Sequence, residues 1–226
     1  PMTQVAMPIL SSLRNQPDRY AKYYQRLLDI MASLTIPVTA YCATEADFLI
    51  GVLLGPAWRG AVPVFRILAI AGLIQAIAGT RGLVLLSWGF SRRYFYWGLF
   101  NAILCVASFL VGLSFGIEGV AGAYAIANYV ILFPSLFFCF PQTPVTIALF
   151  IKTLIPPLVM SALATLGVLL LKTVCMSDTV IAHVLFTLAF LTIYAGLSWR
   201  RPSIRETVHL IIRGLPITLN AKMEAV

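Results

Sequence analysis

Apolar residues in this chain of 226 residues are gathered into six long runs, which short polar segments separate. A helix needs about 20 apolar residues to cross the hydrocarbon core of a bilayer. The runs do not alternate between polar and apolar positions as the strands of a membrane barrel do. The pattern predicts an all-α polytopic membrane helix bundle of about six transmembrane helices. The predicted spans are Leu27–Thr44, Val62–Leu86, Trp97–Phe115, Gly119–Phe138, Ile147–Leu171 and Val180–Trp199.

Two shorter segments lie outside this pattern. Phe48–Leu54 is apolar but too short to cross, which predicts an interfacial or re-entrant piece. In residues 200–226, Ser203 and Glu206 have the spacing of a helix capping box. Apolar residues then recur at helical intervals opposite basic ones, which predicts a C-terminal interfacial amphipathic helix. A disordered tail is the alternative.

Glycines are dense in residues 116–122, where the third run gives way to the fourth. Gly112 and Gly116 have the G-x-x-x-G spacing, and Gly119 and Gly122 follow. Small residues at this spacing let two membrane helices approach closely. The segment predicts a tight turn followed by a closely packed helix face.

Composition supports a membrane protein. Hydrophobic residues make up 60% of the chain and charged residues 11%, against about 25% charged in soluble domains. A chain this short cannot bury so much apolar surface in a soluble core. A soluble enzyme, a disordered chain and a secreted disulfide scaffold are therefore excluded. The net charge of +8 indicates membrane topology and contact with anionic membrane lipid, and not nucleic acid.

The cations are distributed unequally between the loops. Segments 1–26, 87–96, 139–146 and 200–226 together hold 11 Lys and Arg residues, whereas 45–61, 116–118 and 172–179 hold 2. Cytoplasmic loops of membrane proteins carry the excess of Lys and Arg. The distribution predicts that both termini are cytoplasmic.

Catalytic and metal-binding patterns are not found in the sequence. No Ser/His/Asp grouping, carboxylate pair at helical spacing within a run, or phosphate-binding glycine loop occurs. The four cysteines lie more than 30 residues apart, and His183 and His209 stand alone. We therefore predict no catalytic residues, no cofactor and no metal site, and hence no enzyme.

Polar side chains inside the apolar runs are the candidate functional residues: Arg66, Gln75, Arg81, Asn101 and Asn128. Charges in hydrocarbon are costly and commonly functional. The two arginines would lie on one side of an ideal helix, with Gln75 opposite, so they either line a polar substrate pathway or extend to the two headgroup layers. The asparagines either line the same pathway or form hydrogen bonds between helices.

The order of several short motifs resembles a known family. The motifs are Pro8–Leu13, Asn15–Tyr20, Leu53–Trp58, Ala61–Ala69 and Gly116–Ala125. They resemble the C-terminal half of bacterial polysaccharide exporters, flippases for lipopolysaccharide or exopolysaccharide within the multidrug/oligosaccharidyl-lipid/polysaccharide exporter superfamily. The resemblance covers about residues 5–140, and the last two spans match only in hydropathy.

The resemblance implies a division of the chain and a function. Residues 1–26 would be the end of a preceding span and a cytoplasmic loop, 27–138 a four-span part of the C-terminal bundle, 139–199 two additional spans, and 200–226 a cytoplasmic tail. Members of this family flip undecaprenyl-diphosphate-linked glycan across the inner membrane by alternating access. The chain would then be a fragment, and its partner would be the missing N-terminal half of the exporter.

Two alternatives remain open at this stage. A drug/cation antiporter of the same superfamily would need an acidic cation site, and no Asp or Glu lies in the middle of a predicted span. A non-transport membrane protein of glycan assembly would need a long outer loop with catalytic residues, whereas the predicted outer loops are short.

Overall fold

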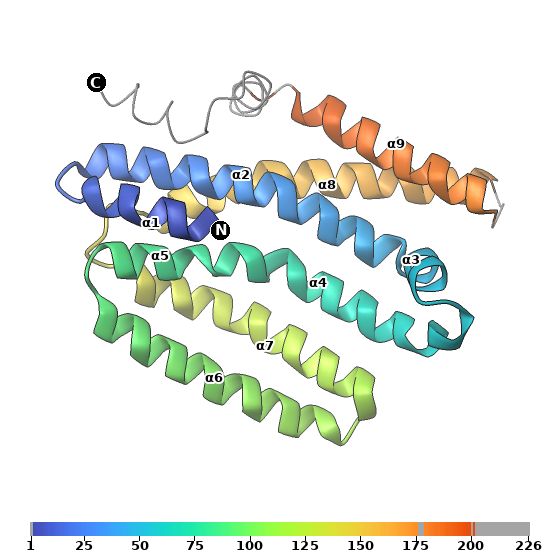
Figure 1. Ribbon diagram of the computed structural model, residues 1–226, viewed down its shortest axis with the longest axis horizontal. Helices are drawn as coiled ribbons and strands as arrows, with labels where there is room; N and C mark the ends of the chain where they lie inside the picture. Colours follow the sequence, from blue (N-terminus) through green and yellow to red (C-terminus); the bar gives the residue numbers. More distant parts are fainter. Residues whose placement is uncertain (1, 176–178, 200, 202–226) are drawn as a thin grey trace.

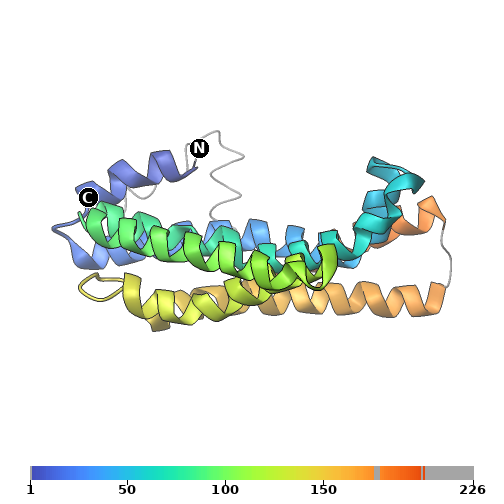
Figure 2. The ribbon, with the colours of Figure 1, turned by 90° about the horizontal axis from the view of Figure 1, so that it is seen from below.

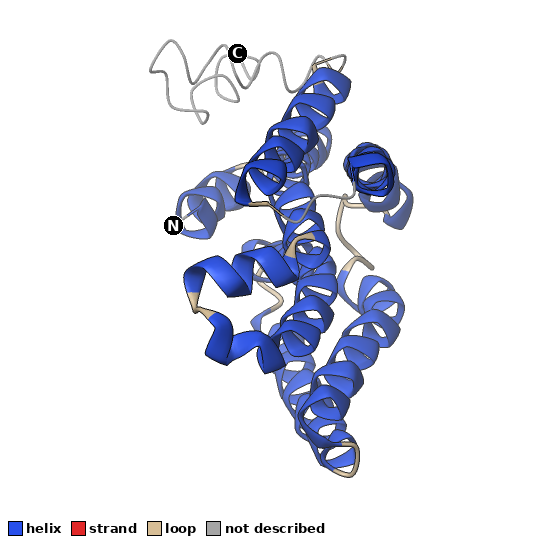
Figure 3. Ribbon diagram, turned by 90° about the vertical axis from the view of Figure 1, so that its right-hand side faces the viewer, coloured by secondary structure: helices blue, strands red, loops and turns tan. Residues whose placement is uncertain are grey.

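The computed structural model describes residues 2–175, 179–199 and 201. All regular elements in this part of the chain are helices (Figure 3). In chain order they are α1 Met2–Ser12, α2 Pro17–Thr44, α3 Ala46–Leu53, the 3-10 helix η1 Pro56–Ala61, α4 Val62–Ala78, α5 Thr80–Ser87, α6 Ser91–Leu113, α7 Gly116–Cys139, α8 Ile147–Cys175 and α9 Val180–Ser198.

Six helical stretches are long and apolar enough to cross a membrane, which confirms the predicted number. They are Pro17–Thr44, Pro56–Ser87, Ser91–Leu113, Gly116–Cys139, Ile147–Thr173 and Val180–Ser198. The protein is therefore an all-α membrane helix bundle. The amphipathic helix predicted in residues 200–226 lies outside the described residues, except for Arg201.

The spans run antiparallel, so the chain turns alternately at the two ends of the bundle (Figure 1). The turns before α2, between α5 and α6, and between α7 and α8 lie at one end. The segments between α2 and α4, α6 and α7, and α8 and α9 lie at the other. We call the first the α2-start end and the second the α2-finish end. Arg14, just before α2, and Arg92 and Arg93, at the start of α6, lie at the α2-start end.

Two short helical pieces stand out from the same face of the bundle at opposite ends (Figure 2). At the α2-start end this piece is α1, which packs against α5. At the α2-finish end it is α3, followed by η1. Residues Phe48–Leu54, expected to be interfacial or re-entrant, thus largely form the short helix α3.

The first span begins ten residues before the predicted start at Leu27. Pro17 and Asp18 favour a first helical turn, because proline there loses no helical hydrogen bond and an acid suits the positive helix end. Tyr20 and Tyr24 then lie on one helical face and are fully buried. Their hydroxyls meet Ser87 Oγ at 2.6 Å and Thr80 Oγ1 at 3.0 Å. These hydrogen bonds connect α2 to α5.

The largest hydrophobic core lies at the α2-start end, where α1, α2, α5, the end of α7 and the start of α8 converge. Its fully buried side chains include Leu10, Leu28, Val84, Leu136 and Phe150. Smaller clusters join α8 to α9 and α3 to α4. Much of the remaining apolar surface is exposed, as expected for helices that face lipid.

Helices α6 and α7 approach each other closely at Gly112 and Gly119, whereas Gly122, predicted on the same packed face, would have no atom within 4 Å of an added methyl group. A methyl group added at Gly112 would stand 2.5 Å from Val120 Cα and 2.7 Å from Gly119 O. Gly116 has a φ of +73°, a left-handed conformation that glycine adopts without strain, and it forms the turn. Gly112 and Gly119 therefore provide the close approach, and Gly116 provides the turn.

Candidate functional site

A polar cleft of about 330 Å³ lies between α4–α5, α6 and α7. Four of the five candidate residues line it: Gln75, Arg81, Asn101 and Asn128. The aromatic side chains of Tyr94, Trp97 and Tyr124 also line it, and Arg81 is the charged member of the lining. The cleft reaches toward the α2-start end, because Tyr94 near the start of α6 and Cys139 at the end of α7 are part of its wall.

The second span is interrupted at Gly79, where α4 ends and α5 begins, although Gly79 keeps right-handed helical dihedral angles of φ -60° and ψ -28°. Side chains that follow the break bond to the carbonyls of the last turn of α4. Thr80 Oγ1 donates to Ile77 O at 2.7 Å, and Arg81 Nε donates to Ala78 O at 2.9 Å. A broken backbone is tolerated in a membrane where neighbouring groups satisfy it and where it lines a cavity. Both conditions hold at Gly79, which itself lines the cleft.

Arg81 also joins α5 to α7. Its Nη1 donates to Leu132 O at 3.3 Å, and the residue is only 7% exposed. A guanidinium carries five donors. The two bonds to protein carbonyls fix its position at the wall of the cleft, in surroundings of low dielectric that strengthen its attraction for an anion.

Gln75 and Asn128 are held by Tyr124. Gln75 Nε2 donates to the Tyr124 hydroxyl, a contact between α4 and α7. Asn128 Nδ2 donates to Tyr124 O at 2.8 Å, one turn back in its own helix. Asn128 thus bonds within α7 and not between helices, while Gln75 supplies the contact between helices.

Asn101 has a different environment. It is exposed, and within the described residues its side chain forms no hydrogen bond. An exposed amide in the middle of a membrane helix is costly where it faces hydrocarbon. Because Asn101 lines the cleft, its amide lies beside other polar side chains and not only against hydrocarbon.

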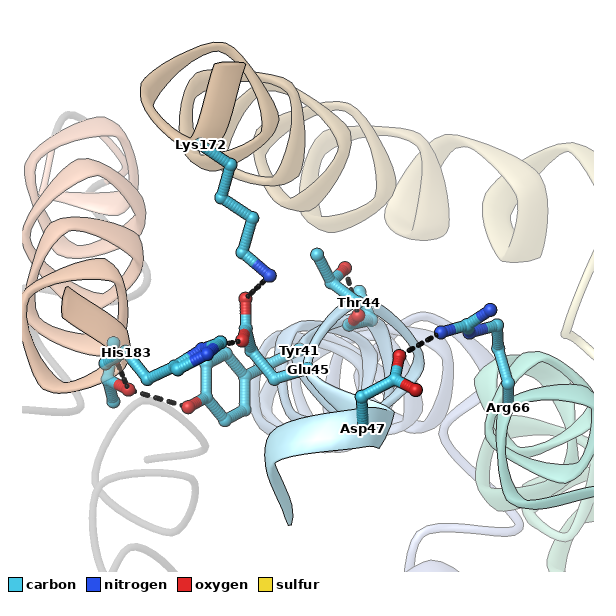
Figure 4. Close-up of polar contacts among 9 residues, drawn as sticks. Tyr41, Thr44, Glu45, Asp47, Arg66, Lys172 and His183 are labelled. Atoms are coloured by element: carbon cyan, nitrogen blue, oxygen red, sulfur yellow. Dashed lines mark hydrogen bonds and ion pairs between the residues drawn. The ribbon is translucent and has the colours of Figure 1, made fainter. Parts of the chain in front are cut away.

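Arg66 does not lie in the cleft. It forms an ion pair of 2.5 Å with Asp47 at the α2-finish end, and the two side chains are 47% and 74% exposed (Figure 4). Arg66 and Gln75 both belong to α4, and Gln75 lies in the cleft while Arg66 does not, as their predicted opposite sides require. The expectation that Arg81 shares the side of Arg66 was wrong, because Arg81 follows the interruption at Gly79 and lies in the cleft with Gln75.

Two charged clusters were not predicted. At the α2-finish end, the carboxylate of Glu45 contacts Lys172 and His183 (Figure 4). At the α2-start end, Asp29 pairs with Arg201 at 2.5 Å, and Asp29 is 6% exposed inside the lengthened α2. These partners are 127 to 172 residues apart in sequence, so no local spacing signals them. Asp29 already lies near the start of the predicted first span. Because α2 begins at Pro17, Asp29 lies near the middle of this helix, so the expectation that no Asp or Glu lies in the middle of a span was wrong for α2.

Comparisons with known proteins give two matches. A family described as polysaccharide biosynthesis proteins matches residues 1–63. The teichuronic acid biosynthesis protein TuaB of Bacillus subtilis (strain 168) is 27% identical over 130 residues, which is 57% of this chain. The chain spans 27% of the length of that relative. No solved structure matches.

The matches confirm the resemblance that the motif order indicated. The chain is similar to polysaccharide biosynthesis proteins, among them one from a bacterium. Together with the six apolar spans, they define a membrane protein related to polysaccharide synthesis.

Proposed function

We propose that this chain is part of a transporter that flips lipid-linked oligosaccharide or polysaccharide across the bacterial inner membrane. The observation that carries the proposal is the cleft at the broken span, where a buried arginine and three amide side chains line one cavity. The similarity to polysaccharide biosynthesis proteins supports the class of cargo.

The chemistry of the lining suits an undecaprenyl-diphosphate-linked glycan. A diphosphate is anionic, and a guanidinium binds phosphate oxygens through paired hydrogen bonds. Amides donate and accept hydrogen bonds, as sugar hydroxyls require. The lining contains Arg81 and no carboxylate, so it favours an anion over a cation. This composition favours a glycan exporter over a drug/cation antiporter.

The orientation that we propose places the α2-start end at the cytoplasm. Arg14, Arg92 and Arg93 lie there, and cytoplasmic loops carry the excess of positive charge. The cleft reaches toward the same end. A lipid-linked glycan made in the cytoplasm would then meet the cleft from the side on which it is assembled.

Alternating access needs two helix bundles that rock against each other around one site. We propose that a second bundle, the N-terminal half in exporters of this kind, completes the cavity against α4–α5, α6 and α7. The chain acts in this scheme by binding and moving its cargo, without forming or breaking a covalent bond.

Asn101→Leu, introduced into the chromosomal gene, tests the proposed function. Because the Asn101 side chain forms no hydrogen bond in the described fold, its removal costs no internal contact. We expect normal protein abundance and about a tenfold loss of surface polysaccharide, since one polar contact to cargo is worth about 1.4 kcal/mol. Leu110→Ala, at a 64% exposed position of the same helix that does not line the cleft, is the control. Full export from Asn101→Leu would refute the proposed role of the cleft.

A further inference from the structure

We propose that a cavity at the α2-finish end of the bundle binds the headgroup of a zwitterionic membrane lipid that carries a primary ammonium. The cavity has a volume of about 620 Å³ and lies between η1 with the start of α4 and the turn from α6 to α7. Its lining includes Trp58, Val64, Phe115, Ile117 and Glu118, and we call it the end cavity. The proposal rests on this lining and does not depend on what the protein transports.

The end cavity lies at the level where spans end, which is the level of lipid headgroups. Helix α6 ends at Leu113 and α7 begins at Gly116, and η1 stands out from the bundle at the same end (Figure 2). Trp58 of η1 is exposed, and tryptophan prefers the layer between hydrocarbon and water. A membrane lipid can therefore reach the end cavity with its headgroup.

The polar chemistry of the end cavity comes from Glu118 and Trp58. Glu118 is the charged member of the lining. Among the described residues, the Glu118 carboxylate has no ion pair or hydrogen bond, and the Trp58 indole has no ring or cation partner. A carboxylate attracts a cation and accepts its hydrogen bonds, and the face of an indole also attracts a cation. Two such groups on one cavity suit an ammonium.

The apolar part of the lining favours a lipid over a soluble amine. Val64, Phe115 and Ile117 line the same cavity, and Phe115 and Ile117 are strongly exposed. Exposed apolar side chains that adjoin polar ones mark sites of membrane or protein interaction. Beside an ammonium site at the headgroup level, they match a molecule whose apolar chains begin directly below its headgroup.

Arg59 supplies the complement for a lipid phosphate. It lies in η1 between two lining residues, Trp58 and Gly60, and forms no ion pair with the described residues. A guanidinium binds phosphate oxygens, so Arg59 and Glu118 together match the phosphate and the ammonium of a zwitterionic headgroup. A primary ammonium donates three hydrogen bonds and a quaternary ammonium donates none, so the Glu118 carboxylate favours the primary one.

¹⁹F NMR of the full chain in detergent micelles, labelled with fluorinated tryptophan, tests the site. The chain has four tryptophans, and Trp58→Phe identifies the Trp58 signal by its loss. We expect dioleoyl phosphatidylethanolamine to shift this signal saturably. Dioleoyl phosphatidylglycerol has the same acyl chains and no ammonium, so it should leave the signal unchanged. Dioleoyl phosphatidylcholine, whose ammonium is quaternary, should bind more weakly than the ethanolamine lipid.

Glu118→Gln should raise the half-saturating concentration of the ethanolamine lipid about fivefold, as expected for the loss of an exposed ion pair. Asp18→Asn is the matched control, because Asp18 is an exposed acid in the first turn of α2, at the opposite end. It should leave the half-saturating concentration unchanged.

The other three tryptophan signals report whether a variant keeps its fold, and the comparison of lipids in the wild-type chain needs no substitution. The proposal would be overturned by the absence of a saturable shift at Trp58 or by equal binding of the ethanolamine lipid and either other lipid. An unchanged half-saturating concentration in a folded Glu118→Gln variant would overturn it as well.

Discussion

Lys172→Met is expected to destabilise the bundle strongly, because it leaves Glu45 buried without its cationic partner. Glu45 is 1% exposed and its oxygen lies 2.6 Å from Lys172 Nζ. Removing one partner of a buried ion pair costs about 3–5 kcal/mol. Lys172 is 27% exposed and His183 still contacts the carboxylate, so we expect a smaller loss of about 2–3 kcal/mol.

Reversible unfolding in mixed detergent micelles, followed by circular dichroism, measures this cost. Lys152→Met is the matched control, because Lys152 lies on the same helix, is exposed and forms no ion pair with the described residues. The double variant Glu45→Gln/Lys172→Met should recover most of the loss, since it removes the buried charge. A loss below about 0.5 kcal/mol for Lys172→Met, within the range of ordinary surface substitutions, would refute the reasoning.

Three further substitutions or labels test the packing and the topology. Gly112→Ala should lower the free energy of unfolding by about 1–3 kcal/mol, because the new methyl group overlaps with α7. Gly122→Ala is the control: its new methyl group has no atom within 4 Å, so the change should be neutral or stabilising. Equal stabilities of the two variants would contradict the close packing. Arg66→Ala should cost less than about 1 kcal/mol, because its ion pair is exposed, and should leave surface polysaccharide unchanged; reduced export with normal abundance would bring Arg66 back into the substrate pathway. Cysteine labels at Ser91 and Trp58 should react from opposite sides of the membrane, and reaction from one side would contradict the antiparallel arrangement.

Hydropathy alone predicted the class of fold and the number of spans. In a bilayer each backbone must satisfy its own hydrogen bonds, so a long apolar run has essentially one structural solution. The first span was predicted too short because its early turns carry polar groups. The periodic signal of Tyr20, Tyr24, Leu27 and Leu28 was present, however, since these residues fall on one helical face.

The candidate site was predicted in its residue types and only partly in its geometry. A polar residue in an apolar run is conspicuous, and Gln75, Arg81, Asn101 and Asn128 indeed line one cleft. The break at Gly79 could not be read from the sequence, because a single glycine within a long helical pattern is usually tolerated.

Contacts between distant segments could not be predicted at all. Glu45 and His183 are 138 residues apart, and the residues around each give no indication of the other. Such pairs are set by how helices pack, which one sequence does not specify. The structure thus adds the charged clusters at both ends to the predicted polar cleft.

Photocrosslinking from position 101 tests most directly whether the cleft binds lipid-linked glycan. A photoreactive amino acid replaces Asn101 in one variant and Leu110 in another, in the chromosomal gene, and adducts are identified by mass spectrometry after irradiation of cells. Position 101 lines the cleft, whereas position 110 lies on the same helix outside it. The proposed function predicts an undecaprenyl-diphosphate-linked glycan adduct at 101 and none, or far less, at 110. Equal labelling at both positions, or only phospholipid adducts at 101, would contradict it.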